Sequence, residues 1–316
     1  MILEIQHETL LEYSGPITEG FTEVRMEPVS DADQSCRSFN IRTVPTVPTY
    51  RYQDGLGNRV HHFDILQPHQ HVSIVAASVV ETHPRAVSLA DCPARYPLAA
   101  EALPLDALDS LAFGGPIRPT PLLSPVLDEL RPSNGANIGG IVAAVSRYVH
   151  ERFEYAQYVT QASSPIDDVL RQGKGVCQDF AHLMIGVLRA FGLPARYVSG
   201  YIHRPGSESQ SHAWVEAWLP PLGWVGIDPT NDCRTTENFV KVASGRDFTD
   251  VPPNKGVYRG LSTQAISVRV ETRELVRLPP LTWQEQLPAL QVPLRTIVPA
   301  AAPPCPNPLQ IEQQQQ

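Results

Sequence analysis

Residues 173–194 read GKGVCQDFAHLMIGVLRAFGLP, and this stretch decides the fold. Its apolar side chains recur at i, i+3, i+4, i+7, i+8 and i+11, the pattern of one buried helix face: Phe180, Leu183, Met184, Val187, Leu188 and Phe191. Gly192 and then Pro194 follow in the order that ends helices. The pattern therefore predicts a helix over 178–191 that begins near Val176 to Gln178.

The chain on both sides of this helix predicts a mixed architecture. Residues 137–153 carry a second apolar stripe at helical spacing. After Pro194, residues 195–202, 211–219 and 224–228 have the composition of strands, and Pro220 to Gly223 supply a turn between the last two. Helices followed by an antiparallel sheet indicate an α+β fold.

The N-terminal part of the chain has the periodicity of strands. Leu3, Ile5, His7 and Thr9 share one face of the first period-2 stretch, and two similar stretches lie at 21–26 and 72–80. Asp54 to Asn58 reads DGLGN, which is typical of a hairpin loop. We therefore expect an antiparallel β-rich module over residues 1–90.

The rest of the chain divides by composition. Residues 91–135 are rich in proline, which predicts a wrapping connector with short helical pieces. Residues 136–275 are expected to form the main core, with a last strand over 265–270. Residues 276–316 are a C-terminal extension whose Pro- and Gln-rich tail is expected to be disordered.

Composition excludes several kinds of partner. The chain has 316 residues and a formal net charge of −8, and it lacks a Lys/Arg run, so we expect no binding to nucleic acid. Its apolar runs are far shorter than the roughly 20 residues that cross a bilayer, so we expect no membrane association. The start at Met1 lacks a signal-peptide pattern, which favours a cytoplasmic location.

The cysteines favour reduced thiols over a disulfide framework. There are five of them, an odd number, and none forms a CxxC pair: Cys36, Cys92, Cys177, Cys233 and Cys305. Zinc sites need close ligand pairs, so we expect no metal and no other cofactor. A rival hypothesis nevertheless keeps a metal site formed by Cys177, His182, His212 and Cys233.

Cys177 stands at the first turn of the predicted 178–191 helix, directly after Gly175 and Val176. The unpaired N–H groups of a helix start stabilise negative charge, and the thiolate is the form of cysteine that attacks carbonyl carbon. Helical spacing also points the sulfur towards the protein body. The alternative is that Cys177 is only a small buried apolar residue, and a partner base decides between the two.

His212 and Asp228 are the predicted partners of this cysteine. His212 opens strand 211–219, and Asp228 ends strand 224–228. If the turn is centred on Pro221, the numbers of directly opposite residues on the two strands add to 442. Asp228 then lies diagonal to His212 on the same face of the sheet. If all four residues 220–223 form the loop, the numbers of opposite residues add to 443 instead. His212 and Asp228 then lie on opposite faces of the sheet unless a bulge intervenes. A carboxylate beside an imidazole fixes its tautomer, which leaves the second nitrogen for the thiol proton.

Other polar residues near these motifs have alternative interpretations. We expect Asp179 to cap the first helical turn and His182 to pack or hydrogen-bond locally. Glu216 lies on the same strand face as His212 and could help to position the His212 ring without contacting substrate. Asp232 is a weaker candidate than Asp228 for the carboxylate that orients His212. Cys233 is interpreted as a thiol without a function.

Four stretches together resemble the bacterial transglutaminase-like proteins. They are GVCQDFAH (175–182), RAFGLPARYVSGY (189–201), SHAWVE (211–216) and GWVGIDPTN (223–231), within a resemblance over residues 136–270. The resemblance implies a papain-like α+β core with Cys177 as nucleophile, His212 as base and Asp228 as its orienting partner. Residues 1–90 likewise resemble the β-rich N-terminal region of many bacterial members.

The sequence departs from this family pattern at the group that stabilises the oxyanion. Related transglutaminases often use a tryptophan upstream of the cysteine, whereas all four tryptophans here lie downstream, at 214, 218, 224 and 283. The backbone N–H of Cys177 is one available donor, and Tyr155 and Gln178 are candidates for the second. No acidic calcium loop is present in the sequence.

The sequence therefore predicts thiol-dependent acyl transfer or hydrolysis on an amide, such as a glutamine side chain or a peptide bond. The expected partner is a protein or peptide substrate, together with an amine acceptor if the reaction is a transfer. Transglutamination, deamidation, proteolysis and amide synthesis all remain open, because one acyl-enzyme serves each of them. The alternative is a transglutaminase-like binding module without catalytic activity.

Overall fold

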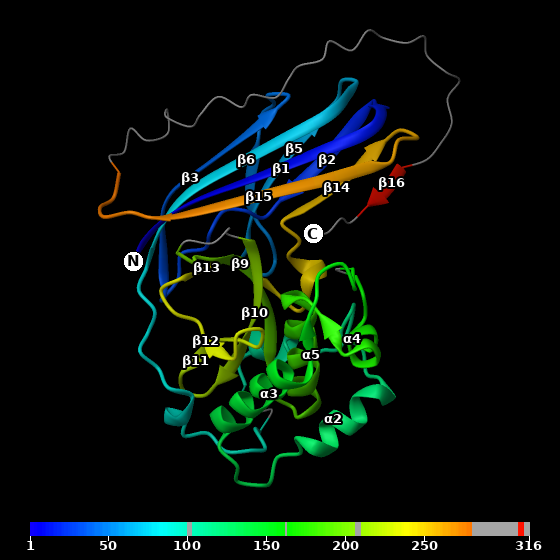
Figure 1. Ribbon diagram of the computed structural model, residues 1–316. Helices are drawn as coiled ribbons and strands as arrows, with labels where there is room; N and C mark the ends of the chain where they lie inside the picture. The colour runs from blue at the N-terminus through cyan, green and yellow to red at the C-terminus, as the bar shows by residue number, and fades with distance from the viewer. Residues whose placement is uncertain (100–102, 162, 206–209, 280–308, 313–316) are drawn as a thin grey trace.

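The structure is a computed structural model that describes residues 1–99, 103–161, 163–205, 210–279 and 309–312 (Figure 1). Its helices, with η for 3-10 helices, are η1 (Leu89–Asp91), α1 (Leu105–Asp109), η3 (Pro121–Leu123), α2 (Ser124–Glu129), α3 (Ile138–Arg152), α4 (Ile166–Gln172), α5 (Cys177–Ala190) and η4 (Phe248–Asp250). No helix in these ranges is both long and apolar enough to cross a membrane.

The strands form three sheets and one short parallel pair. In chain order they are β1 (Ile2–Ile17), β2 (Glu19–Val24), β3 (Gln34–Val44), β4 (Tyr50–Gln53), β5 (Arg59–Ile65), β6 (His69–Thr82), β7 (Glu154–Tyr155), β8 (Lys174–Gly175), β9 (Ala195–Ile202), β10 (Gln210–Leu219), β11 (Gly223–Asp228), β12 (Cys233–Arg234), β13 (Phe239–Gly245), β14 (Asn254–Arg259), β15 (Gln264–Glu274) and β16 (Leu309–Glu312).

The core is an antiparallel sheet covered by helices, which confirms the predicted α+β class. Its strand order is β12-β11-β10-β9-β13, and α5 packs on β9 and β10 with α3 and α4 beside it (Figure 1). The predicted apolar stripe of α5 is buried, at roughly 1.5–3 kcal/mol for each large apolar side chain. The other side of the helix is buried as well from Asp179 to Arg189. Arg189 is accommodated there because its guanidinium donates to the carbonyls of Ser110, Ala112, Ala195 and Arg246.

The N-terminal module consists of two facing antiparallel sheets, as the period-2 stretches predict. One has the order β15-β1-β6-β3, and the other has the order β16-β14-β2-β5-β4. The predicted hairpin loop joins β4 and β5. Strands β14 and β15 follow the core in sequence, yet they pair with β2 and β1, so the chain returns to the first module after completing the core (Figure 1). Residues 254–274, which composition placed in the core segment, therefore lie in these sheets.

The inward face of β1 packs against different parts of the protein at its two ends. Leu3 and Ile5 pack into the apolar cluster of the core, whereas Leu11 and Tyr13 pack between the two sheets of the N-terminal module. His7 lies between these two packed regions, at the junction of the module and the core, where it hydrogen-bonds the hydroxyl of Tyr201 on β9. The inward side chains of β1 thus belong to the packing of both units and hold them together.

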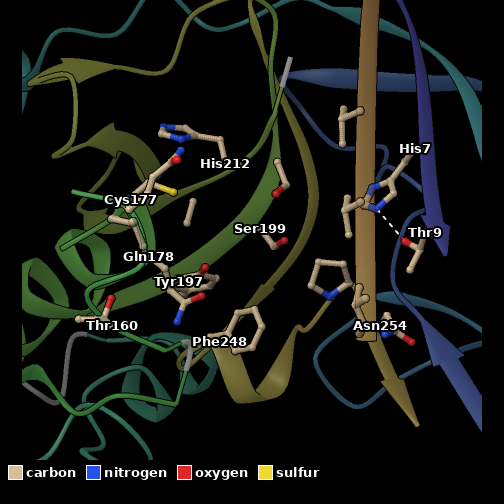
Figure 2. Close-up of a pocket in the computed structure, with 18 of the residues that line it drawn as sticks. His7, Thr9, Thr160, Cys177, Gln178, Tyr197, Ser199, His212, Phe248 and Asn254 are labelled. Atoms are coloured by element: carbon tan, nitrogen blue, oxygen red, sulfur yellow. Dashed lines mark hydrogen bonds between the residues drawn. The ribbon is translucent and has the colours of Figure 1, made fainter. Parts of the chain in front are cut away.

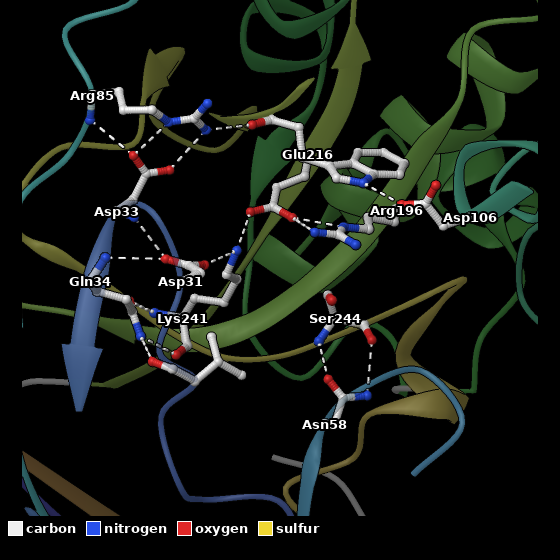
Figure 3. A network of polar contacts seen from close by, with 12 residues as sticks. Asp31, Asp33, Gln34, Asn58, Arg85, Asp106, Arg196, Glu216, Lys241 and Ser244 are labelled. Atoms are coloured by element: carbon white, nitrogen blue, oxygen red, sulfur yellow. Dashed lines mark hydrogen bonds and ion pairs between the residues drawn. The ribbon is translucent and has the colours of Figure 1, made fainter. Parts of the chain in front are cut away.

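A partly buried polar network joins the two units along β13 (Figure 3). Lys241 Nζ lies 2.6 Å from Asp31 Oδ2 and 2.7 Å from Glu216 Oε1, and Arg196 pairs with the other oxygen of Glu216. The side-chain amide of Gln34 exchanges hydrogen bonds with the backbone N–H and C=O of Lys241. These contacts satisfy the edge of β13 and hold it against the module.

Several strands were not predicted from the sequence, among them β5, β13 and β14, and two edge segments show why. Strand β3 was not predicted, and its burial pattern explains why: as an edge strand it lacks a clear period of two. The tail prediction for 276–316 falls mostly outside the described residues. Residues 309–312, however, form β16 rather than a disordered segment, because their backbone pairs with the open edge of β14.

We predict that Glu216→Ala lowers the free energy of unfolding by about 3 kcal/mol, since it leaves the partly buried cations of Lys241 and Arg196 without this buried carboxylate. Guanidinium denaturation monitored by tryptophan fluorescence measures the change. Glu271→Ala, which breaks an exposed ion pair with Arg269 on β15, is the matched control and should stay close to wild type. Equal losses in both variants would contradict the structural role of the network.

Candidate active site

The turn before α5 places Cys177 at the first residue of the helix. Gly175 is required there, because a Cβ at this position would lie 2.8 Å from the Asp179 side chain. Asp179 accepts hydrogen bonds from the Val176 backbone N–H and from the Thr160 hydroxyl, which confirms the predicted cap. The backbone N–H of Cys177 itself lies in the helix turn that has no intrahelical acceptors.

His212 and Asp228 meet on one face of the core sheet. The β10–β11 register pairs Val215 with Ile227, so opposite residues sum to 442, the first of the two alternatives considered above. His212 Nε2 and Asp228 Oδ2 are 2.7 Å apart. The other ring nitrogen, Nδ1, remains for Cys177, whose side chain lies beside the ring and contributes to its raised pKa (Figure 2). The structure thus brings the three predicted residues together in the expected order.

Packing fixes the orientation of the His212 ring. Trp214 stacks against it with ring centroids 6.3 Å apart and is itself only 2% exposed. The indole fits because residue 200 is glycine: a Cβ there would lie 2.5 Å from the Trp214 ring and 2.1 Å from the Val240 carbonyl oxygen. Gly200 on β9 therefore leaves the room that the Trp214 ring needs, and the Trp214 ring in turn fixes the position of the His212 imidazole on β10.

The electrostatics of the pair favour a charged ring beside a charged carboxylate. Burial opposes the imidazolium, but the hydrogen bond to Asp228 and the interaction with Cys177 outweigh it and raise the pKa of His212 to about 10. Burial likewise opposes the Asp228 carboxylate, yet His212, the Asn231 amide and the Thr230 N–H hold its pKa below the usual value. At neutral pH the ring is therefore an imidazolium that can donate a proton.

These residues open into a cleft of about 590 Å³ between the core and the N-terminal module. Figure 2 shows Cys177 and His212 on one side and His7 and Thr9 of β1 on the other. Strand β15 contributes the apolar part of the second wall: Ile266, Val268 and Val270. The cleft is thus formed jointly by both units.

The other candidate residues lie in different surroundings. Tyr155 and Gln178, the two candidates for the second oxyanion donor, line the cleft. His182 is buried away from it and packs against the Tyr197 ring, which is one of the two expected roles. Its Nε2 accepts the backbone N–H of Phe248, so its hydrogen bond joins distant residues rather than local ones. Asp232 accepts from the Ser146 hydroxyl rather than from His212.

The remaining two candidates from the sequence are Glu216 and Cys233. Glu216 belongs to the ion-pair network of Figure 3 and does not support the His212 ring. Cys233 lies on the edge strand β12. Among the described residues, no group of three or more His, Cys, Asp and Glu side chains could hold a metal ion, so the four residues of the rival metal hypothesis do not form one site.

Sequence reasoning missed part of the cleft. Tyr197 and Ser199 on β9 line it beside Cys177, and the β15 wall stands opposite. The alternation of residues 195–202 contained a usable signal, since odd positions share one face. The contribution of β15 depends on its pairing with β1, which joins residues more than 250 positions apart.

The family follows from comparison with known proteins. Residues 131–229 match the transglutaminase-like superfamily, and residues 3–81 match the bacterial transglutaminase-like N-terminal region. An uncharacterised protein of Mycobacterium leprae is 35% identical over 289 residues, which cover 86% of this chain and 99% of that protein. The chain belongs to the transglutaminase-like superfamily. Both of its units match regions known from this superfamily.

Two further relatives carry descriptive names. A protein-glutamine gamma-glutamyltransferase of Pseudomonas aeruginosa is 32% identical over 162 residues, which cover 46% of this chain and 24% of that enzyme. A crystal structure described as a candidate cysteine protease from Cytophaga hutchinsonii superimposes with a TM-score of 0.74 at 20% identity, over 88% of this chain and 93% of that one. The second comparison shows that the two share a fold.

We predict that Asp228→Asn lowers the pKa of His212 by roughly 1 to 3 pH units, because the variant removes the anion that stabilises the imidazolium. Titration of ring-labelled protein by 15N NMR, with His212→Gln to assign the signal, measures the value. Asp232→Asn is the matched control, since this carboxylate contacts Ser146 instead. A His212 pKa unchanged by Asp228→Asn contradicts the coupling.

Proposed function

We propose that this protein is a cysteine-dependent acyltransferase or hydrolase that acts on an amide through a thioester intermediate. The observation that carries the proposal is the position of the His212 ring, in contact with the Asp228 carboxylate on one side and with Cys177 on the other. This order of contacts activates a thiol, because the ring holds the thiol proton while the carboxylate stabilises the resulting imidazolium.

In the first half of the proposed reaction, the Cys177 sulfur attacks the carbonyl carbon of the amide and forms a C–S bond. The carbonyl oxygen takes the negative charge, and the Cys177 backbone N–H is one donor that can face it. The His212 imidazolium then gives its proton to the amide nitrogen as the C–N bond breaks. Ammonia or an amine leaves, and a thioester remains on the cysteine.

In the second half, water or a primary amine attacks the thioester carbonyl. His212, now neutral, accepts a proton from the attacking group, and the C–S bond breaks to restore the thiolate beside the imidazolium. Water gives an acid, and an amine gives a new amide. The same three residues therefore serve hydrolysis and transfer, and the choice depends on which nucleophile reaches the thioester.

The proposed substrate is a glutamine side chain or a peptide bond of a protein or peptide. A cleft of about 590 Å³ has the size for a side chain with its flanking backbone. Among the described residues that line it, none is Asp, Glu, Lys or Arg, which suits an uncharged amide. The name of the Pseudomonas aeruginosa relative makes glutamine the first acyl donor to test.

We predict that the protein modifies glutamine residues of a test protein in the presence of an isotope-labelled primary amine, and that Cys177→Ser abolishes the reaction. Peptide mass spectrometry distinguishes the products: a gain of the amine mass reports transfer, conversion of Gln to Glu reports hydrolysis of the side chain, and new chain termini report peptide cleavage.

Cys233→Ser is the control for this experiment, because it removes a thiol on the edge strand β12 rather than the one beside His212. It should retain the wild-type product and rate. The proposal fails if wild type and Cys177→Ser give the same peptide maps in all three readouts, which is the outcome expected of a binding module without catalytic activity.

A further inference from the structure

Two buried hydroxyls beside the nucleophile have no partner in the part of the chain that the structure describes. Tyr197 and Ser199 alternate with Tyr201 on the inward face of β9, and the first two line the cleft. Tyr197 is 3% exposed and Ser199 is 7% exposed. The Tyr201 hydroxyl hydrogen-bonds His7, whereas within the described ranges no protein group hydrogen-bonds the hydroxyl of Tyr197 or of Ser199.

This arrangement is unusual for groups so deeply buried. Buried tyrosine hydroxyls normally find a hydrogen-bond partner, and an unmade hydrogen bond costs stability. Neither oxygen is among the fully enclosed unpartnered polar atoms, so both face the space of the cleft rather than the packed core. Figure 2 shows the two side chains in the region between Cys177 and β15. The missing partner is therefore a group that enters the cleft.

We propose that Tyr197 and Ser199 bind the amide that Cys177 attacks, with Tyr197 donating to the carbonyl oxygen and Ser199 accepting from the amide N–H. This inference rests on the proposed function and defines its substrate more closely. A hydroxyl can both donate and accept, and a carboxamide offers both an acceptor and a donor. A carboxylate offers no donor and an ammonium no acceptor, so the pair selects neutral amides.

Tyr197 is suited to the oxygen of the reacting carbonyl. Burial and the proximity of Cys177 raise the pKa of its phenol well above the usual value, so the phenol keeps its proton when charge develops on the substrate. Tyr155, in contrast, is 47% exposed and shares its surroundings with water. A donor held in a water-excluded position contributes most to an oxyanion. Tyr197 thus supplies the second donor in a chain without an upstream tryptophan.

The first test separates oxyanion stabilisation from thiol activation. We expect Tyr197→Phe to slow acylation of Cys177 by p-nitrophenyl acetate about 100-fold, as read by intact mass and nitrophenol release. Reaction of Cys177 with methyl methanethiosulfonate should stay within about 2-fold of wild type, because this thiol exchange releases a sulfinate and involves neither an amide nor an oxyanion. An equal effect on both rates, or no effect on acylation, overturns the assignment.

Tyr201→Phe is the matched control, because it removes a hydroxyl from the same strand face that is already bonded to His7. We expect it to retain the wild-type acylation rate. The activated ester makes this experiment independent of amide turnover: if the wild type accepts the ester but neither modifies glutamine nor cleaves a peptide bond, the proposed function fails while the role of Tyr197 is still decided.

The second test addresses Ser199 through binding alone. A blocked glutamine peptide should protect wild-type Cys177 from iodoacetamide better than the corresponding glutamate peptide, and Ser199→Ala should lose this difference. Tyr201→Phe should keep the wild-type difference between the two peptides, because its hydroxyl is already bonded to His7. Equal protection by both peptides in the wild type, or a difference that survives in Ser199→Ala, overturns the selection of neutral amides.

Discussion

The hydrogen bond between His212 and the buried Asp228 carboxylate is the interaction on which the candidate site depends. It raises the pKa of the ring, so that the imidazolium persists beside the Cys177 sulfur at neutral pH. The contact exists because the β10–β11 register places the two residues on one face and diagonal to each other. A slip of one residue in that register would move Asp228 to the opposite face and leave the cysteine without a charged partner.

The N-terminal module completes the site rather than merely preceding it. One strand, β1, packs against the core at Leu3 and against the second sheet at Leu11, and between these contacts it forms a wall of the cleft. Strand β15 extends that wall after the chain has passed through the whole core. The partly buried network around Glu216 and Lys241 fixes the two units together, which keeps the wall in place across from the nucleophile.

The sequence predicted those parts of the structure that local patterns determine. The 3.6-residue period of α5, the glycines before Cys177 and the alternation of β1 depend on neighbouring residues, so they could be recognised directly. The register of β10 and β11 was narrowed to two alternatives, and the geometry of the turn decides between them. The family resemblance then assigned roles that periodicity alone does not give.

The parts that depend on distant contacts could not be predicted. Arg189 lies outside the predicted apolar stripe of α5, yet its guanidinium is buried because carbonyls from three separate segments meet around it. The pairing of β15 with β1 was hidden for the same reason, and with it the second wall of the cleft. The role of the Tyr197 and Ser199 hydroxyls could not be predicted either, because they face a cleft that exists only when β15 forms its second wall.

The most direct test of the account is the rate at which iodoacetamide alkylates each cysteine at pH 6, followed by peptide mapping. The account predicts fast modification of Cys177 alone, slowed on the order of 100-fold in His212→Ala, because a thiol with an ordinary pKa of about 8.5 is less than about 1% thiolate at that pH. Slow and equal modification of all the cysteines, or a Cys177 rate that is the same with and without the imidazole, would contradict it.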